Sequence, residues 1–131
     1  MNGWRLPTEA EWEYACRAGT NSDYGGNGVI NDMGWFSDNS GMKMHQSGKK
    51  NRNDFDLYDM HGNLWEWCWD YYGESYYNFS PVSDPQGPSG GTKRVVRGGS
   101  WSDGKKYARA ANRTTPDTFR NNIGFRIVRN P

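Results

Sequence analysis

The sequence contains too few cysteines for a disulfide framework or a cysteine-based zinc site. Only two occur among its 131 residues, Cys16 and Cys68, whereas a framework needs several pairs. Neither belongs to a Cys-x-x-Cys pair or a cysteine–histidine cluster, which are the patterns that hold zinc. Two isolated cysteines also leave the redox compartment undecided.

The sequence also lacks long apolar runs and an excess of charge of one sign. No stretch approaches the roughly 20 apolar residues of a membrane-spanning helix. The start, Met1-Asn2-Gly3-Trp4, has neither the basic nor the apolar region of a secretion signal. We therefore expect no membrane insertion by this chain. Its 16 basic and 15 acidic residues give a net charge of +1, which argues against nucleic acid as a partner because it creates no attractive field.

Aliphatic residues are scarce, but aromatic residues are abundant. A hydrophobic fraction of 34% and a mean hydropathy of -1.07 would by themselves suggest disorder. The 7 Trp, 8 Tyr and 5 Phe bury large areas, so we expect an aromatic core. The 17 Gly and 6 Pro predict turns and irregular loops. The length fits a single domain, residues 1–131, which we expect to be a monomer.

The clearest predicted element is a helix between Arg5 and Gly19. Thr8 is placed to cap the first turn, and Glu11, three residues later, completes a capping box. Gly19 supplies the left-handed residue that ends a helix. Cys16 falls on the face that we expect to be buried, so we interpret it as a small core residue rather than a nucleophile.

Residues 20–53 predict a long loop, because they are rich in Gly, Asn, Ser and Asp and contain isolated aromatic anchors at Trp35 and Phe36. His45 stands alone in this loop and is interpreted as a surface residue. Further along, residues 94–101 predict a strand that ends in a tight turn, and residues 123–128 predict a closing strand. The polar stretch between them predicts a loop with a short helical piece around residues 109–113.

The segment 56–70 allows two interpretations. In the first, two carboxylates and two backbone carbonyls point at one centre, which is the oxygen chemistry that calcium prefers. The residues concerned are Asp59, Gly62, Leu64 and Glu66. In the second, Trp65, Trp67 and Trp69 alternate as in a strand with one aromatic face, and Glu66 is satisfied by backbone amides. The residues leave both interpretations open.

Five arginines in the C-terminal third are expected to form ion pairs and carbonyl hydrogen bonds that replace regular structure. They are Arg94, Arg97, Arg109, Arg113 and Arg126.

Four segments in order resemble the formylglycine-generating enzyme (sulfatase-modifying factor) family. They are RLPTEAEWEYACRAG, LYDMHGNLWEWCWD, RVVRGGSW and a final segment that ends in IGFR. The resemblance runs from residue 5 to residue 128 and lacks the family's usual N-terminal portion. It implies an α+β fold of the C-type-lectin-like kind, irregular and with little regular secondary structure. It also favours a cell-surface or secreted location.

The resemblance implies a scaffold without the family's enzymatic activity. In the enzymes, a pair of cysteines after the GGS(W/Y) motif oxidises a substrate cysteine with copper, for which thiolates are indispensable. The matching residues 102–108 contain no cysteine, so we expect neither this activity nor bound copper. Family members bind calcium through a segment that looks like residues 59–66, which implies one structural Ca²⁺ here.

The chain also resembles a related set of proteins that display a variable surface on this scaffold. Retroelements diversify them by adenine-directed mutagenesis of Asn codons near the C-terminus. Nine residues of this chain are of types reachable from such a codon, and we predict that they form an exposed ligand-binding surface. They are Ser102, Asp103, Gly104, Tyr107, Thr114, Thr118, Phe119, Asn121 and Asn122. The expected ligand is a protein or another macromolecule.

An alternative within the same family is a metal-dependent oxidase or a sulfoxide-synthase-like enzyme. The sulfoxide synthases need a histidine-rich iron site, and this chain has only His45 and His61. Metal analysis of the purified protein discriminates, because stoichiometric iron or copper would favour the enzyme.

Overall fold

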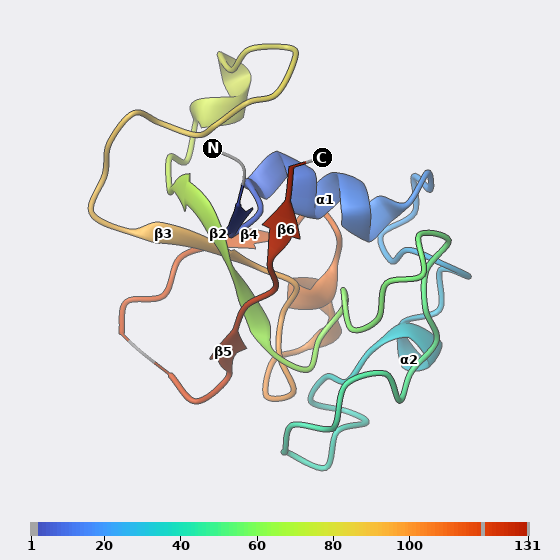
Figure 1. Ribbon diagram of the computed structural model, residues 1–131. Coiled ribbons are helices and arrows are strands. Elements are labelled where there is room, and N and C mark those ends of the chain that lie inside the picture. Colours follow the sequence, from blue (N-terminus) through green and yellow to red (C-terminus); the bar gives the residue numbers. More distant parts are fainter. Residues whose placement is uncertain (1–2, 119, 131) are drawn as a thin grey trace.

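A four-stranded sheet crossed by one helix positions the rest of the chain (Figure 1). The computed structural model describes residues 3–118 and 120–130. The helices are α1 (Glu9–Arg17), α2 (Ile30–Met33) and the 3₁₀ helices η1 (Tyr76–Asn78) and η2 (Lys105–Ala108). The strands are β1 (Trp4–Arg5), β2 (Trp65–Tyr71), β3 (Arg94–Arg97), β4 (Arg113–Thr114), β5 (Ile123–Gly124) and β6 (Val128–Arg129).

The predicted capping box starts α1. The backbone N–H of Glu11 donates to Thr8 Oγ1 at 3.2 Å, and the N–H of Thr8 donates to the Glu11 carboxylate at 2.8 Å. The predicted end is one residue late, because Ala18 is already left-handed, with φ 45°, and its N–H bonds the carbonyl of Tyr14. Gly19 follows with φ 86°, so two consecutive left-handed residues turn the chain away from the helix.

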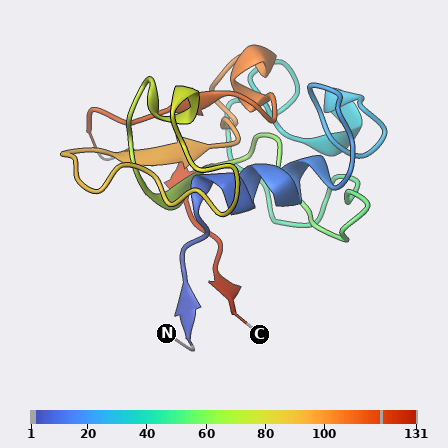
Figure 2. The same cartoon turned by 90° about the horizontal axis from the view of Figure 1, so that it is seen from above.

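The sheet has the order β4-β3-β2-β5. β3 pairs antiparallel with β2, and β5 pairs parallel with β2 through Ile123 and Trp65. The closing strand predicted at 123–128 is wrong as a single element. β6 instead pairs with β1, and the two form a ribbon that leads away from the sheet (Figure 2). The predicted helical piece at 109–113 is also misplaced, because η2 ends at Ala108 and Arg113 belongs to β4.

The two faces of β2 differ in a way that the tryptophan pattern does not predict. Glu66, Cys68 and Asp70 are buried on the face that α1 covers, whereas the tryptophan face runs from buried Trp65 to Trp69, which is 52% exposed. Side chains alternate along a strand, so the acidic and sulfur-containing residues face the core.

The core is less aromatic than expected. Its buried cluster contains one tryptophan together with sulfur-containing and small side chains: Trp12, Cys16, Met60, Cys68, Val95 and Ala110.

Buried ion pairs occupy the edge of this core. Arg97 is fully buried and donates to Glu9 at 3.0 Å, to Glu13 and to the carbonyl of Ala110. Arg113 donates to both carboxylate oxygens of Glu9, at 2.6 and 2.9 Å. These contacts confirm the expectation that arginines replace regular structure, since they join α1 to β3 and β4.

His61 joins three separate loops. Its Nε2 accepts from the N–H of Gly25 at 2.8 Å, and its Nδ1 lies 2.7 Å from the carbonyl of Ala108. Because Nε2 accepts, Nδ1 carries the proton and donates to that carbonyl. Burial lowers the pKa of His61, although the Ala108 hydrogen bond acts in the opposite direction. The ring is therefore neutral and structural.

Candidate binding surface on the open face of the sheet

The turn after β3 brings the C-terminal loop back onto the sheet. Gly98 and Gly99 have φ 98° and 73°, which only glycine adopts readily. A Cβ on Gly99 would lie 3.0 Å from backbone atoms of Tyr107 and Ala108. η2 therefore packs directly against the turn.

Hydrogen bonds hold part of the predicted variable surface in a fixed arrangement. Trp65 Nε1 donates to Asp103 Oδ2 at 2.8 Å, and the hydroxyl of Ser100 donates to the same oxygen. The side-chain amide of Asn122 donates to Ser100 Oγ at 3.1 Å and to Ser102 Oγ at 3.2 Å. Ser102, Asp103 and Asn122, which are distant in sequence, thus belong to one network.

A pocket of about 250 Å³ opens beside this network. We call it the Trp65 pocket. Four of the nine predicted residues line it: Asp103, Tyr107, Thr114 and Asn122. The other lining residues are Trp65, Val96, Thr115, Pro116, Asp117, Arg120 and Ile123. The ring of Tyr107 meets the Trp65 indole edge to face, with centroids 6.4 Å apart.

The remaining predicted residues lie around the pocket or outside the described chain. Ser102 belongs to the network, and Gly104 precedes η2. Thr118 and Asn121 are exposed, whereas Phe119 lies outside the described residues.

The expectation that all nine residues are exposed is wrong for Asn122. This side chain is only 5% exposed, because it bonds Ser100 and Ser102 beneath the loop. Asn122 therefore supports the surface from below.

Sequence reasoning missed Trp65 and Thr115 as lining residues. Their positions depend on which face of β2 the helix covers, and the tryptophan periodicity alone does not decide this. The alternation of Trp65 with Glu66 was the available signal, since a buried Glu66 places Trp65 on the opposite face.

Two polar atoms at the pocket have no hydrogen-bond partner within the described chain. Asn122 Oδ1 and Thr115 Oγ1 are both buried without one. Asp103 has no basic side chain within 4.0 Å among the described residues. Asp117, at the same pocket, is paired with Lys93 at 2.5 Å. The Trp65 pocket thus has Asp103, Asp117 and Arg120 in its lining together with the rings of Trp65 and Tyr107.

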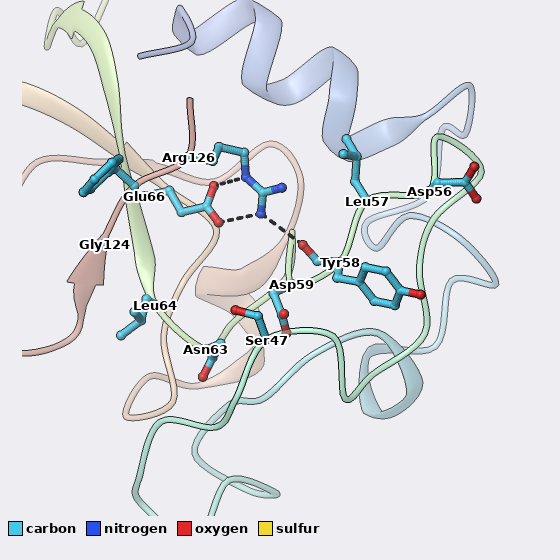
Figure 3. A pocket seen from close by; sticks show the side chains of 11 residues that line it. Ser47, Asp56, Leu57, Tyr58, Asp59, Asn63, Leu64, Glu66, Gly124 and Arg126 are labelled. Carbon is cyan, nitrogen blue, oxygen red and sulfur yellow. Dashed lines mark hydrogen bonds and ion pairs between the residues drawn. The ribbon is translucent and has the colours of Figure 1, made fainter. Parts of the chain in front are cut away.

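A second pocket, of about 400 Å³, lies on the α1 face beside Glu66. We call it the Glu66 pocket. Figure 3 shows the Arg126 guanidinium between the Glu66 carboxylate and the carbonyl of Tyr58. Arg126 bonds both carboxylate oxygens at 2.6 Å, and Trp12 Nε1 donates to Glu66 at 2.7 Å. The expectation that backbone amides satisfy Glu66 is therefore wrong.

The predicted calcium ligands contribute unequally to the Glu66 pocket. Asp59, Leu64 and Glu66 line it (Figure 3). Asp59 Oδ2 accepts from the N–H of Gly48 at 2.9 Å, and Asp59 Oδ1 is buried without a partner. Gly62 has φ 89°, and a Cβ there would lie 2.1 Å from the Trp35 carbonyl oxygen. Close backbone packing thus requires this glycine whether or not an ion binds.

The oxygen donors at the Glu66 pocket are of the kind that calcium takes, with one uncommitted carboxylate oxygen at Asp59. Within residues 3–118 and 120–130, no group of three or more His, Cys, Asp or Glu residues is placed to hold a metal. An ion at this pocket would therefore depend on backbone carbonyls as well as on Asp59.

The two thiols are buried and unactivated. Burial raises the pKa of Cys16 to about 12, and it also raises the pKa of Cys68. Cys16 Sγ lies 3.5 Å from His61 Nε2, but that nitrogen already accepts from Gly25. Neither cysteine lines the Trp65 pocket, so no thiolate is available there.

No helix in the described part of the chain is both long and apolar enough to cross a bilayer.

Comparison with known proteins gives consistent matches over the full length. Residues 1–131 match the family described as "Sulfatase-modifying factor enzyme 1-like domain". A formylglycine-generating enzyme of Streptomyces coelicolor is 36% identical over 96% of this chain and 46% of its own length. The serine/threonine-protein kinase pkn1 of Chlamydia caviae is 39% identical over 97% of this chain and 21% of its own length. The chain thus spans less than half of either relative.

Among solved structures, "Treponema denticola variable protein 1" superposes with a TM-score of 0.87 and 36% identity. The superposition covers 99% of this chain and 49% of that protein. The predicted α+β fold of the C-type-lectin-like kind is thereby confirmed.

Proposed function

The chain belongs to the family of sulfatase-modifying factor enzyme 1-like domains, and from this premise we propose that it is a non-catalytic binding protein. Its ligand is a protein or another macromolecule, and it is held at the Trp65 pocket and the exposed rim of that pocket. The observation that carries the proposal is the convergence of Asp103, Tyr107, Thr114 and Asn122 on one pocket. These residues come from three separate segments.

The state of the thiols supports a binding role. Thiol oxidation of the kind performed by the formylglycine-generating enzymes needs an accessible thiolate. Cys16 and Cys68 are both 0% exposed, and burial raises the pKa of each thiol. The similarity to a protein named as a variable protein, over 99% of this chain, favours display in place of that chemistry.

The arrangement suits a binding surface whose exposed residues vary in sequence while the buried residues beneath them stay the same. Tyr107, Thr118 and Asn121 are exposed and can change at little cost to folding. Ser100 and Asn122 hold the loop from below. We propose that diversification by a retroelement acts on the exposed positions, with the buried network as a constant frame.

The chemistry of the histidines does not favour an iron-dependent oxidase. Both ring nitrogens of His61 are engaged by backbone groups. His45 stacks on Trp35 with centroids 3.7 Å apart, and its Nε2 lies 2.6 Å from the carbonyl of Ser40. Neither ring nitrogen of His61 is free to bind iron, and His45 by itself does not make the histidine-rich site that such an enzyme needs.

We further propose a structural calcium ion at the Glu66 pocket. Asp59 and the carbonyls of Gly62 and Leu64 would hold it, with Glu66 shared between the ion and Arg126. The ion would fasten the loop before β2 to the strand. A location at the cell surface or outside the cell, and a monomeric state, are part of the same proposal.

The experiment is a randomised library at Tyr107, Thr118 and Asn121, displayed on yeast and sorted for folded protein. A matched library randomises the core residues Trp12 and Val95. The proposal predicts that most clones of the first library fold, that most of the second do not, and that the first yields binders to unrelated proteins. Loss of folding in the first library would place those residues in the core and overturn the proposal.

A second measurement tests the absence of catalysis. The purified protein is incubated with a cysteine-bearing sulfatase peptide and copper, and the peptide mass is followed. We expect the mass to remain unchanged. Conversion of the cysteine to an aldehyde would contradict the proposed function.

A further inference from the structure

A third pocket, of about 550 Å³, lies where the β1–β6 ribbon meets the end of β2. We call it the Trp4 pocket. It has no lining residue in common with the Trp65 pocket or the Glu66 pocket. Its volume lies in the range of roughly 300–1,000 Å³ that is usual for small-molecule sites. The lining residues are Gly3, Trp4, Arg5, Thr8, Trp69, Gln86 and Asn130.

The two tryptophans of the Trp4 pocket expose large apolar surfaces. Trp4 is 66% exposed and Trp69 is 52% exposed, although tryptophan side chains are on average highly buried. Both backbones are held in place, because Trp4 pairs with Arg129 in the ribbon and the N–H of Trp69 donates to the carbonyl of Pro7 at 2.8 Å. Two exposed aromatic rings on fixed backbones favour a ligand with a flat apolar face.

The charges around the Trp4 pocket argue against an ionic ligand. The guanidinium of Arg129 lies 5.9 Å from the centroid of one indole, and that of Arg94 lies 5.1 Å from the centroid of the other. A cationic ligand on these rings would be repelled. Among the described lining residues only Arg5 is charged, and it bonds both carboxylate oxygens of Glu11 at 2.7 Å. The lining itself therefore has no unpaired charge for an anion.

The neutral polar groups of the lining match hydroxyl groups. Gln86 and Asn130 are exposed primary amides. Gln86 Nε2 donates to the carbonyl of Asp84 at 3.1 Å, and Asn130 Oδ1 accepts from Arg5 at 2.8 Å. The other amide atoms, Gln86 Oε1 and Asn130 Nδ2, form no hydrogen bond with the described residues. They offer one acceptor and one donor, and a hydroxyl group can use both because it donates and accepts.

A neighbouring pocket extends this surface along β2. It has a volume of about 370 Å³ and shares Trp69 and Gln86 with the Trp4 pocket. It adds Tyr71, whose ring centroid lies 3.8 Å from the guanidinium of Arg94. Three aromatic side chains thus line two adjoining pockets, which suits an extended ligand with a repeated flat unit better than a single small ring.

A chain of pyranose sugars combines these properties. One face of a pyranose ring carries C–H groups that contact the negative face of an indole, and its rim carries hydroxyls. We infer that the Trp4 pocket binds an uncharged oligosaccharide, with Trp4 and Trp69 as stacking surfaces and Gln86 and Asn130 as hydrogen-bond partners of its hydroxyls. The inference goes beyond the proposed function, because it concerns a separate surface that contains none of the predicted variable residues.

The experiment follows the indole N–H resonances of Trp4 and Trp69 in the ¹⁵N-labelled protein, assigned with Trp4→Phe and Trp69→Phe variants. The probes are maltotriose, cellotriose and tri-N-acetylchitotriose. Three control compounds accompany them: cyclohexylmethanol lacks the array of hydroxyls, trigalacturonic acid adds negative charge, and tetraproline is a peptide with flat apolar rings. We expect a saturable shift of both resonances with at least one of the three neutral trisaccharides and no saturable shift with the controls.

Variants then test the assigned roles. Trp4→Ala and Trp69→Ala each remove one stacking surface, so the affinity for the binding trisaccharide should fall about tenfold. Gln86→Leu nearly keeps the size of the side chain, removes its amide and should weaken binding less. The matched control Phe79→Ala removes a ring that is 88% exposed and lines neither pocket. It should leave the affinity within about twofold, as expected for a surface substitution outside the site.

Calcium separates this site from the Glu66 pocket. No carboxylate is among the described residues that line the Trp4 pocket, so sugar binding should be the same in calcium and in EDTA. Loss of binding in EDTA would assign the sugar to the Glu66 pocket and overturn the inference.

The remaining outcomes are equally decisive. No saturable shift of either indole with any of the three trisaccharides would overturn the inference, and so would tighter binding of trigalacturonic acid or tetraproline. If Trp69→Ala fails to fold, an unchanged affinity in Trp4→Ala would overturn it independently, because Trp4 is exposed on the ribbon. The libraries that test display at the Trp65 pocket leave the Trp4 pocket unaltered, so the proposed function and this inference can fail separately.

Discussion

Trp65 and Glu66 are neighbours on β2 that face opposite sides of the sheet, so one strand serves both pockets. Glu66 turns toward α1 and forms the ion pair with Arg126, whereas Trp65 turns toward η2 and bonds Asp103. The buried ion pair therefore holds in place the strand that contributes Trp65 to the binding surface. Substitution of Glu66 should lower the unfolding free energy, whereas substitution of Asp103 should lower the affinity for the ligand.

The first prediction concerns this ion pair. Glu66→Gln leaves Arg126 partly buried without a counter-ion, which typically costs about 3–5 kcal/mol. Urea denaturation followed by tryptophan fluorescence measures the change. Asp117→Asn breaks the exposed pair with Lys93 and should change the midpoint little. Equal changes of the urea midpoint in the two variants would mean that the Glu66–Arg126 pair contributes no more to stability than an exposed ion pair.

The second prediction separates the supporting turn from the variable loop. Gly99→Ala places a Cβ 3.0 Å from the backbone of η2 at a positive φ and should destabilise by about 1–3 kcal/mol, the usual range for overpacking. Gly104 has open space around its Cβ position and φ -65°, so Gly104→Ala should be nearly neutral. Thermal unfolding of both variants gives the comparison. Similar losses would contradict the division between support and surface.

Local signals made part of this fold predictable. The capping box of Thr8 and Glu11 lies within four residues, so the sequence alone places the start of α1. The sequence does not identify the partner of a short strand. Residue 128 belongs to the predicted closing strand 123–128, yet together with residue 129 it pairs with β1, more than 120 residues away.

The candidate surface was predictable in kind but not in detail. The codon argument found Tyr107 and Thr114, which do line the pocket. It also included Asn122, whose burial depends on Ser100 and Ser102 folding over it. The sequence did not predict Trp65 as a lining residue, because Trp67 and Trp69 follow it with the same alternation. Only the packing of α1 against the other face of β2 shows which face is available to line a pocket.

The third prediction is a pH dependence that arises from His61. Burial holds the pKa of the folded state below its ordinary value of 6.5, so the unfolded state takes up a proton first as the pH falls. Stability from this group is complete above about pH 6.5 and is lost progressively below it, toward the folded pKa. The unfolding free energy, measured between pH 8 and pH 5, should fall in this window. In His61→Gln the curve should be flatter there, and an unchanged slope would assign the dependence to other groups.

The fourth prediction tests the proposed calcium ion. Calcium should raise the melting temperature relative to EDTA, because an ion that binds only the folded state stabilises it by mass action. Asp59→Asn removes the buried carboxylate and should abolish most of this rise. Asp54→Asn changes an exposed carboxylate nearby in the sequence and should preserve it. If the unsubstituted protein has the same melting temperature with calcium as with EDTA, the proposed ion is ruled out.

The last prediction concerns the thiols, because an accessible thiolate is required for thiol oxidation but not for ligand binding. Cys16 and Cys68 are fully buried, and burial raises the pKa of both, so each is a neutral thiol without solvent access. Ellman's reagent should react with neither in the native protein at pH 8 and with both in urea. The native rate should therefore follow global unfolding and fall with every stabilising condition. A fast reaction of either thiol in the native protein would reveal an accessible thiolate and would contradict the proposal that this scaffold performs no thiol chemistry.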